Sequence, residues 1–240
     1  MSETLLRVDG VSAGYGAVRV VWEASLDVRV REIVCLVGSN GAGKTSLLRR
    51  ISGLLPAVGG RIRLRDRDLT AATSAEVLGA GIAHVPEGRR LFATMTVQNN
   101  LLMGAYLRTD GAAAVRRDLD MVMTIFPVLR DRRRQDAATL SGGEQQMCAI
   151  ARGFMSRPAL LMIDELSLGL APRAVERLGE ALLEINRAGI AILLVEQDIA
   201  LAFALASRGF VLDSGRVILT GASVDLARDP SVRAAYMGLA

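Results

Sequence analysis

The sequence has few of the residues on which disulfide frameworks, metal sites and membrane spans depend. Its 240 residues include 2 cysteines and 1 histidine, and aromatic residues make up 4%. The spacing of Cys35 and Cys148 matches no metal site, so we expect two buried, reduced thiols. The longest apolar runs, such as Ile190–Val195 and Ile199–Ala206, are far shorter than the roughly 18 residues of a membrane-spanning helix. The first residues show no secretory signal pattern, and a soluble cytoplasmic protein is expected.

Lysine is almost absent as well. Every basic residue except Lys44 is arginine, and the net charge is only +4. An ammonium group is a compact point charge on a flexible stem, so a single lysine in such a chain indicates a site that needs one. With few aromatic residues and a modest charge, no nucleic-acid partner is expected. The arginine-rich run 130–134 is interpreted as a solvated helix end or a partner contact.

The first third of the chain predicts strands around a glycine-rich loop. Apolar and polar residues alternate over 24–31 and 61–64, as in strands with one solvated face. Between them Ile33–Val37 is continuously apolar, which is typical of a strand buried on both faces of a parallel sheet. This strand leads into the loop and then into a predicted helix from Lys44 to Leu55, which stops before Pro56.

The rest of the chain predicts helices followed by alternating strands and helices. Thr96 can cap a helix to about Leu107, and apolar residues recur at helical spacing from Val115 to Phe126. The later segments are strands at Leu160–Ile163, Ile190–Val195 and Gly209–Leu212, and helices at about Arg173–Arg187 and Ile199–Ala206. This alternation favours a parallel sheet covered by helices, and the length suits one large domain.

The loop after Ile33–Val37 fits the pattern of a phosphate-binding loop. It reads G-S-N-G-A-G-K-T and lies between an apolar strand and a helix, as the pattern requires. Backbone N–H groups of such a loop surround a phosphate chain, Lys44 reaches the terminal phosphates and Thr45 offers a hydroxyl to Mg²⁺. A glycine-rich turn without a ligand is the alternative. The predicted ATP-binding residues are Gly38, Ser39, Asn40, Gly41, Ala42, Gly43, Lys44, Thr45 and Ser46.

A second glycine-containing segment, L-S-G-G-E-Q-Q, begins at Leu140. Ser141 and Glu144 have capping-box spacing, so an ordinary helix start is one interpretation. Glycine in a first helical turn costs about 1 kcal/mol relative to alanine. Two such residues, Gly142 and Gly143, therefore indicate that the backbone approaches another body closely, and a phosphate at the helix N-terminus fits.

Together these two segments resemble the ABC ATPase family, whose signature motif Leu140–Gln146 matches. The resemblance implies a P-loop NTPase α/β core with an N-terminal antiparallel β-subdomain and an inserted helical subdomain. The expected bounds are about 1–86 and 155–240 for the core with its β-subdomain, and 87–154 for the inserted part. In the family, the signature of one subunit closes over ATP bound to another. Ser141, Gly142 and Gly143 are thus expected at a partner's ATP.

Acidic residues after the next buried strand complete the expected site. Asp164 follows an apolar run, as does the Mg²⁺-binding acid of P-loop ATPases, and Glu165 can deprotonate the attacking water. The spacing of this pair from the signature agrees with the family. By resemblance, Tyr15 in G-Y-G stacks on adenine, although a turn tyrosine is the alternative.

Several positions depart from the general family pattern. Gln197 stands where most members have a histidine, and Glu87 stands where a Mg²⁺-sensing glutamine is usual. Leu166 replaces a proline. Together V-P-E-G-R-R, S-L-G-L-A-P, V-E-Q and the closing A-A-Y-M-G resemble the second ATPase subunit of bacterial branched-chain amino-acid importers. We therefore expect Gln197 to contact phosphate and Glu87 to face the metal, while His84 is expected to be structural.

The resemblance implies an importer subunit at the cytoplasmic face of the inner membrane. Its expected partners are a second ABC ATPase subunit, two transmembrane permease subunits and, indirectly, a periplasmic binding protein. The segment from Glu87 through the helical part is expected to form the coupling surface. Alternatives are an exporter ATPase, and a DNA-repair or ribosome-associated ATPase. The latter usually carries a long coiled coil between the two motifs, or two cassettes in one chain. Here the interval from Lys44 to Ser141 has room only for a small helical subdomain, and the chain has one cassette.

Overall fold

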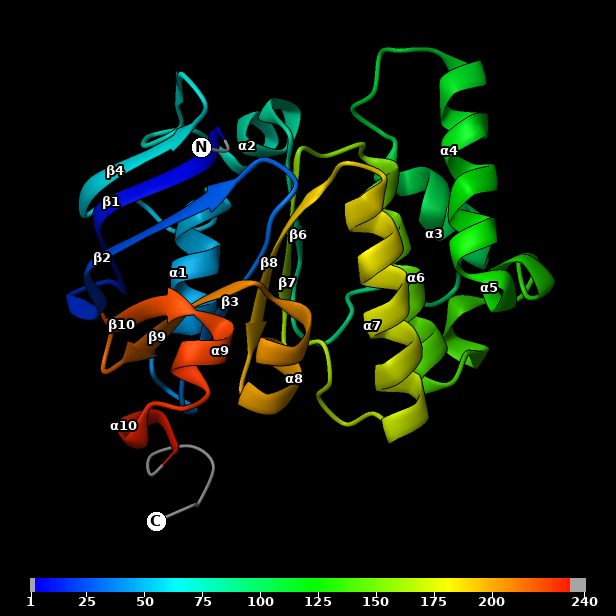
Figure 1. Cartoon of the computed structure of the whole chain (residues 1–240). Coiled ribbons are helices and arrows are strands. Elements are labelled where there is room, and N and C mark those ends of the chain that lie inside the picture. Colours follow the sequence, from blue (N-terminus) through cyan, green and yellow to red (C-terminus); the bar gives the residue numbers. More distant parts are fainter. Residues whose placement is uncertain (1–2, 234–240) are drawn as a thin grey trace.

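The computed structural model describes residues 3–233, which form two sheets and the helices around them (Figure 1). The first sheet is antiparallel, in the order β2-β1-β4-β5. Its strands are β1 (Thr4–Tyr15), β2 (Val18–Arg29), β4 (Gly59–Leu64) and β5 (Arg67–Asp68). Along β2, buried Ala24, Leu26 and Val28 alternate with more exposed residues. The alternation predicted at 24–31 is confirmed, and so is the N-terminal antiparallel sheet.

The second sheet carries the site, in the order β10-β9-β3-β8-β7-β6. Its strands are β3 (Ile33–Val37), β6 (Ile82–Val85), β7 (Leu160–Asp164), β8 (Ala191–Glu196), β9 (Arg208–Asp213) and β10 (Arg216–Ala222). All neighbours are parallel except β9 and β10. Every residue of β3, β7 and β8 is buried, which confirms the parallel sheet predicted from continuous apolar runs.

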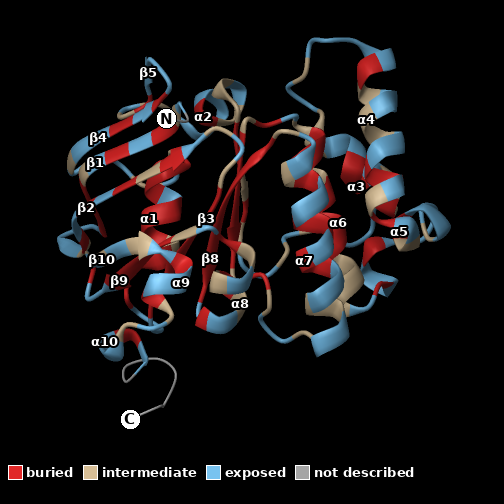
Figure 2. Ribbon diagram, in the orientation of Figure 1, coloured by how far each residue is buried: buried red, intermediate tan, exposed pale blue. Residues whose placement is uncertain are grey.

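Helices cover both faces of this sheet. Helix α1 (Lys44–Ile51) lies between the two sheets, and its buried leucines share one core with both of them. The opposite face packs against α6 (Gly142–Met155), α7 (Pro172–Arg187) and α8 (Ile199–Leu205). Figure 2 shows that the buried residues concentrate in the strands and on the inward faces of these helices.

The inserted helical part lies beyond α6 and α7, at the far right of Figure 1. It contains α3 (Val97–Gly104), α4 (Ala112–Ile125) and α5 (Pro127–Asp131). The Thr96 hydroxyl accepts a hydrogen bond from Asn99 N at 3.1 Å, so the predicted cap of α3 is confirmed. The short helices are α2 (Ser74–Ala80), α9 (Ser223–Leu226) and α10 (Pro230–Val232).

Two predicted helix ends are wrong. Helix α1 stops at Ile51 and does not reach Leu55, because Gly53 adopts φ +69° and packs against the Ala72 carbonyl, which would lie 2.7 Å from an added Cβ. Helix α3 stops at Gly104 and does not reach Leu107. There the chain tightens into turns in which Tyr106 N donates to Met103 O at 3.3 Å.

Within residues 3–233 no helix has both the length and the apolar composition needed to cross a bilayer. The closing A-A-Y-M-G segment, 234–238, lies outside the described residues.

Candidate nucleotide-binding site

The glycine-rich loop turns directly from β3 into α1. Gly41 and Gly43 have φ values of +81° and +104°, which side chains with a Cβ rarely adopt. A Cβ on Gly38 would collide with the Leu212 carbonyl. Helix α1 begins at Lys44 with no side-chain cap and no acidic residue in its first turn. Its first N–H groups and its positive dipole end therefore remain available to an anion.

Lys44 is buried at the mouth of this loop and already holds three oxygen atoms. Its Nζ donates to Gly38 O at 2.7 Å and to Ser39 O at 3.3 Å. It also lies 3.2 Å from Glu165 Oε1, and the two side chains are 5% and 10% exposed. A phosphate that enters the loop would compete with Glu165 for the ammonium group.

The loop borders an open pocket of about 510 Å³ that gathers most of the predicted site residues. Its lining residues are Val20, Ser39, Asn40, Gly41, Ala42, Gly43, Lys44, Thr45, Ser46, Glu87, Glu165, Leu168 and Gln197. Residues from the β6–α3 loop, from the end of β7 and from the end of β8 thus meet the phosphate loop. Sequence reasoning named all of these except Val20 and Leu168.

Asp164 lies beneath the pocket at the end of β7. Its side chain is fully buried, and neither carboxylate oxygen has a hydrogen-bond partner. The pKa of Asp164 is raised to about 6, mainly by burial and also by the nearby Glu165 and Glu87 carboxylates, while the Thr45 hydroxyl and the Lys44 charge act in the opposite direction. Buried carboxylates are normally paired with another group or bound to a cation, so the absence of a partner at Asp164 indicates a place for a cation. The described residues contain no cluster of three or more histidine, cysteine or acidic side chains that could hold a metal alone.

Glu165, directly after this strand, has an unusual backbone conformation. Its φ is +54°, in the left-handed region that non-glycine residues rarely occupy. Its amide donates to Val195 O at 2.9 Å, which ties the residue to the neighbouring strand β8. Such conformations persist where the surroundings hold them, and they cluster at functional sites.

Tyr15 does not line the pocket, although it lies beside it. Its side chain is 44% exposed at the end of β1. The hydroxyl accepts a hydrogen bond from Arg49 Nη1 at 2.9 Å and one from Ser46 Oγ at 3.5 Å. Hydrogen bonding from Ser46, with Arg49 adding to it, lowers the pKa of Tyr15.

The signature segment does not line its own chain's pocket either. Ser141 caps α6 through a complete capping box with Glu144, so the ordinary helix start is present in the single chain. The lack of a side chain at Gly143 also has an internal cause, because an added Cβ would lie 2.8 Å from Ala174 Cβ on α7. A Cβ added at Gly142 would have the Arg89 guanidinium as its nearest neighbour, at 3.1 Å.

Sequence reasoning missed two arginines that hold this segment. Arg132 Nε lies 3.0 Å from Glu144 Oε1, so the predicted solvated run 130–134 includes a contact to the signature. Arg89 Nη1 donates to Gln145 Oε1 at 3.0 Å. No spacing in the sequence indicates either pair, because the partners lie on separate elements. His84 is expected to be structural. Its Nδ1 lies 2.9 Å from Ser52 Oγ in a hydrogen bond, which agrees with that role.

A strand, a glycine loop and an uncapped helix bearing Lys44, with Asp164 and Glu165 at the end of β7 in the same sheet, define a P-loop ATPase. The model of the ABC transporter family matches residues 21–167. The branched-chain amino acid transport ATP-binding protein BraG of Pseudomonas aeruginosa is 42% identical over 98% of this chain and 100% of its own length. The probable branched-chain amino acid transport ATP-binding protein LivF of Archaeoglobus fulgidus is 32% identical, with 98% and 99% covered.

Solved structures agree with this result. A solved structure of an ATP-binding subunit of an ABC transporter superimposes with a TM-score of 0.83 at 31% identity, over 98% of this chain and 96% of that one. The chain belongs to the ABC transporter family, as an ATP-binding, ATP-hydrolysing subunit.

Proposed function

We propose that this chain powers an ABC importer of branched-chain or other hydrophobic amino acids. The observation that carries the hydrolytic part is the meeting of Lys44, Glu165 and Gln197 in one pocket at an uncapped helix start. The amino-acid part is supported by the end-to-end likeness to proteins named for branched-chain amino acid transport.

ATP binding rearranges the contacts of Lys44. Residues 38–46 surround the phosphates, Lys44 exchanges Glu165 for the terminal phosphate oxygens, and the aromatic ring of Tyr15 stacks on adenine. Glu165 is then free to accept the proton of a water whose oxygen bonds to the γ-phosphorus. The bond from that phosphorus to the bridging oxygen breaks, and ADP and phosphate leave. Gln197 donates a hydrogen bond to the phosphate, which an amide can do without a positive charge.

The residues around Asp164 fit a Mg²⁺ ion. Hard cations favour carboxylate, hydroxyl and phosphate oxygens, and the buried Asp164 carboxylate has no other partner. Asp164, Thr45 and Glu87 would hold Mg²⁺ together with the nucleotide. When bound, the ion neutralises charge on the phosphates.

A second ATPase subunit completes each site. Ser141, Gly142 and Gly143 lie outside their own chain's pocket, which supports their action on ATP bound to the partner subunit. Ser141 is exposed at the start of α6, where the helix dipole favours an anion.

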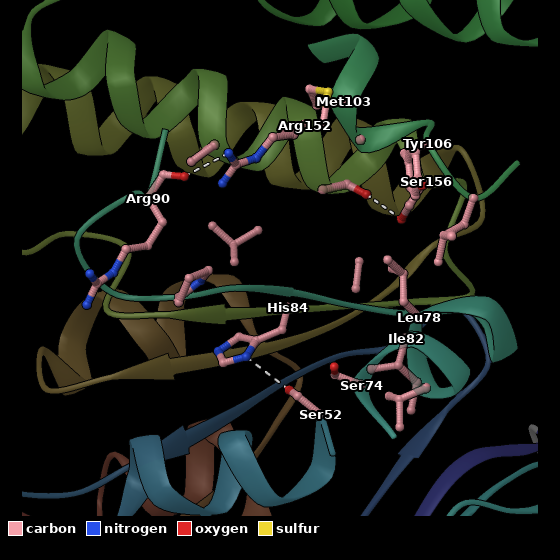
Figure 3. Close-up of a pocket in the computed structure, with 18 of the residues that line it drawn as sticks. Ser52, Ser74, Leu78, Ile82, His84, Arg90, Met103, Tyr106, Arg152 and Ser156 are labelled. Atoms are coloured by element: carbon pink, nitrogen blue, oxygen red, sulfur yellow. Dashed lines mark hydrogen bonds between the residues drawn. The ribbon is translucent and has the colours of Figure 1, made fainter. Parts of the chain in front are cut away.

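A groove of about 610 Å³ between the core and the helical part is the proposed seat for the permease (Figure 3). Its rim exposes the large apolar side chains Phe92, Met103, Tyr106 and Leu107, and Tyr106 is 78% exposed. Among the described residues that line it, Arg90 and Arg152 are the only charged ones, so the groove suits an apolar helix with an acidic residue. Docking here sets the protein at the cytoplasmic face of the membrane and, through the permease, links it to a periplasmic binding protein.

The general base is tested by Glu165→Gln. Because the amide cannot take the proton, turnover should fall at least 100-fold while ATP binding stays within a few-fold of wild type. Phosphate release and fluorescent-ATP titration measure the two properties. Glu184→Gln, on the exposed face of α7, is the matched control and should hydrolyse normally. Turnover by Glu165→Gln within tenfold of wild type would remove Glu165 from this role.

The groove and the import direction are tested together in vesicles that carry an ABC permease with which this chain assembles. Tyr106→Asp should abolish ATP-driven uptake of radiolabelled leucine, because a charge enters an apolar interface, yet leave hydrolysis by the purified subunit unchanged. Tyr106→Phe should transport normally. Normal uptake by Tyr106→Asp would contradict docking at this groove, and ATP-driven efflux in wild-type vesicles would favour the exporter alternative.

A further inference from the structure

Glu196 is a buried acid at the centre of the site that no step above uses. It is the last residue of β8, and its side chain is fully buried. In the sheet, β8 lies between β3, which leads to the phosphate loop, and β7, which ends in Asp164. The Glu196 side chain therefore starts between the two halves of the catalytic machinery.

This carboxylate accepts three hydrogen bonds, and all three come from catalytic segments. Oε1 accepts the Ser167 backbone N–H at 2.8 Å. Oε2 accepts the Ser167 hydroxyl at 3.1 Å and the backbone N–H of Gln197 at 3.2 Å. One side chain thus fixes the loop after Glu165 and the backbone of Gln197 relative to each other.

The loop that Glu196 holds contains the strained Glu165. The Glu165 amide bonds to the Val195 carbonyl at 2.9 Å, and Ser167 bonds to Glu196, so consecutive residues of β8 hold the loop at two points. Between those points Leu166 is fully buried. A left-handed non-glycine residue persists only where several contacts determine it, and these are such contacts.

We infer that Glu196 is a positioning residue for ATP hydrolysis, which sets Glu165 and Gln197 in register with the phosphate loop. This inference rests on the proposed hydrolytic roles of those two residues. Only an acceptor without protons satisfies all three donors. A glutamine at this position has the same shape, but in either orientation its NH₂ group faces a backbone N–H, of Ser167 or of Gln197.

The test compares Glu196→Gln with Ser167→Ala in ATPase assays of the chain assembled with its second ATPase subunit. In Glu196→Gln the kcat should fall at least tenfold, while the KM for ATP and the affinity for a fluorescent ATP analogue stay within threefold. Ser167→Ala removes only the hydroxyl bond and should lower kcat two- to fivefold. If Glu196→Gln does not fold, Ser167→Ala decides alone, and an unchanged kcat overturns the inference.

Glu32→Gln is the control for a merely structural effect. Glu32 is 12% exposed and paired with Arg208 away from the pocket, so its amide variant should lower the melting temperature without changing kcat. A kcat of Glu196→Gln within twofold of wild type overturns the inference. So does an equal loss of kcat in Glu32→Gln, since stability alone would then explain both. The proposed function fails separately, if the wild-type chain assembled with its second ATPase subunit hydrolyses no ATP.

Discussion

At the scale of single residues, the site contains a buried acid that has no partner in the absence of a ligand, and a lysine that is paired with the proposed general base. The Asp164 carboxylate is buried with no partner, and Lys44 is paired with the proposed base, Glu165. A buried unpaired charge opposes folding, so this residue is retained at a cost that a bound cation would offset. In its proposed role as a metal ligand, Asp164 is a place where function and stability conflict.

Asp164→Asn separates the two properties. The pKa of Asp164 is about 6 in the folded chain, which is above its value in the unfolded chain. The wild-type chain therefore loses stability as pH rises from the unfolded pKa of Asp164 to about 6, and the loss is complete above that pH. The neutral amide should stabilise the nucleotide-free chain at pH 7.5 by about 1–3 kcal/mol and should abolish hydrolysis. Urea unfolding at pH 5 and pH 7.5 measures this. The gain should be smaller at pH 5, and a destabilised variant at pH 7.5 would contradict the account.

At the scale of elements, the start of α6 serves two purposes. Its capping box and the Arg132–Glu144 ion pair stabilise the helix within the chain, yet its N-cap residue Ser141 is exposed. The two glycines there differ in their surroundings. Gly143 lies against the methyl group of Ala174, and Gly142 lies against the movable end of Arg89.

The paired substitutions Gly142→Ala and Gly143→Ala should therefore differ in stability. Gly143→Ala pushes α6 from α7 and should destabilise the fold by about 1–3 kcal/mol, as overpacking does. Gly142→Ala moves only a flexible guanidinium and gains helix propensity, so its stability should change by less than about 1 kcal/mol. Both should impair hydrolysis if both face a partner's ATP. Thermal melting of the two variants measures the difference, and equal stability would contradict these contacts.

At the scale of the whole molecule, Arg208 joins the two sheets. From β9 it donates to both Asp27 carboxylate oxygens at 2.9 and 2.8 Å, and to both Glu32 oxygens at 3.0 and 3.1 Å. It also lies 5.2 Å above the Phe210 ring. The guanidinium lowers the pKa of Asp27, and the two acids raise the pKa of Arg208. This planar group pairs bidentately with two carboxylates, a geometry that the point charge of a lysine does not offer.

Arg208→Lys should accordingly destabilise the chain by about 2 kcal/mol, because it leaves partly buried acids incompletely paired. Arg216→Lys, in an exposed pair with Glu23, should change stability by less than about 0.5 kcal/mol. The pKa of Asp27 is lower in the folded chain than in the unfolded chain. The wild-type chain therefore keeps the stabilisation from the Arg208–Asp27 pair above the unfolded pKa of Asp27, and loses it as pH falls through the folded pKa of Asp27. Urea unfolding at pH 7 and pH 3 tests both statements, and equal effects of the two variants would refute the role of Arg208.

Much of the fold could be predicted because strand burial leaves a local pattern. The apolar run Ile33–Val37 and the alternation along 24–31 each correspond to an observed strand. Helix ends were less predictable. Helix α1 ends early because Gly53 packs against Ala72, a contact between separate segments that no local pattern reports.

The sequence by itself determined the glycine-rich loop proposed to hold phosphate, because residues 38–46 are contiguous and their backbone preferences are local. It also placed Asp164 and Glu165 at a strand end. Only the tertiary structure decided how these parts meet. The order β3-β8-β7 sets β8 between the cradle and the acids, brings Glu165 to Lys44, leaves Asp164 without a partner and gives Glu196 its three donors. Such contacts depend on strand order and packing, and residues far apart in the chain carry no local record of them.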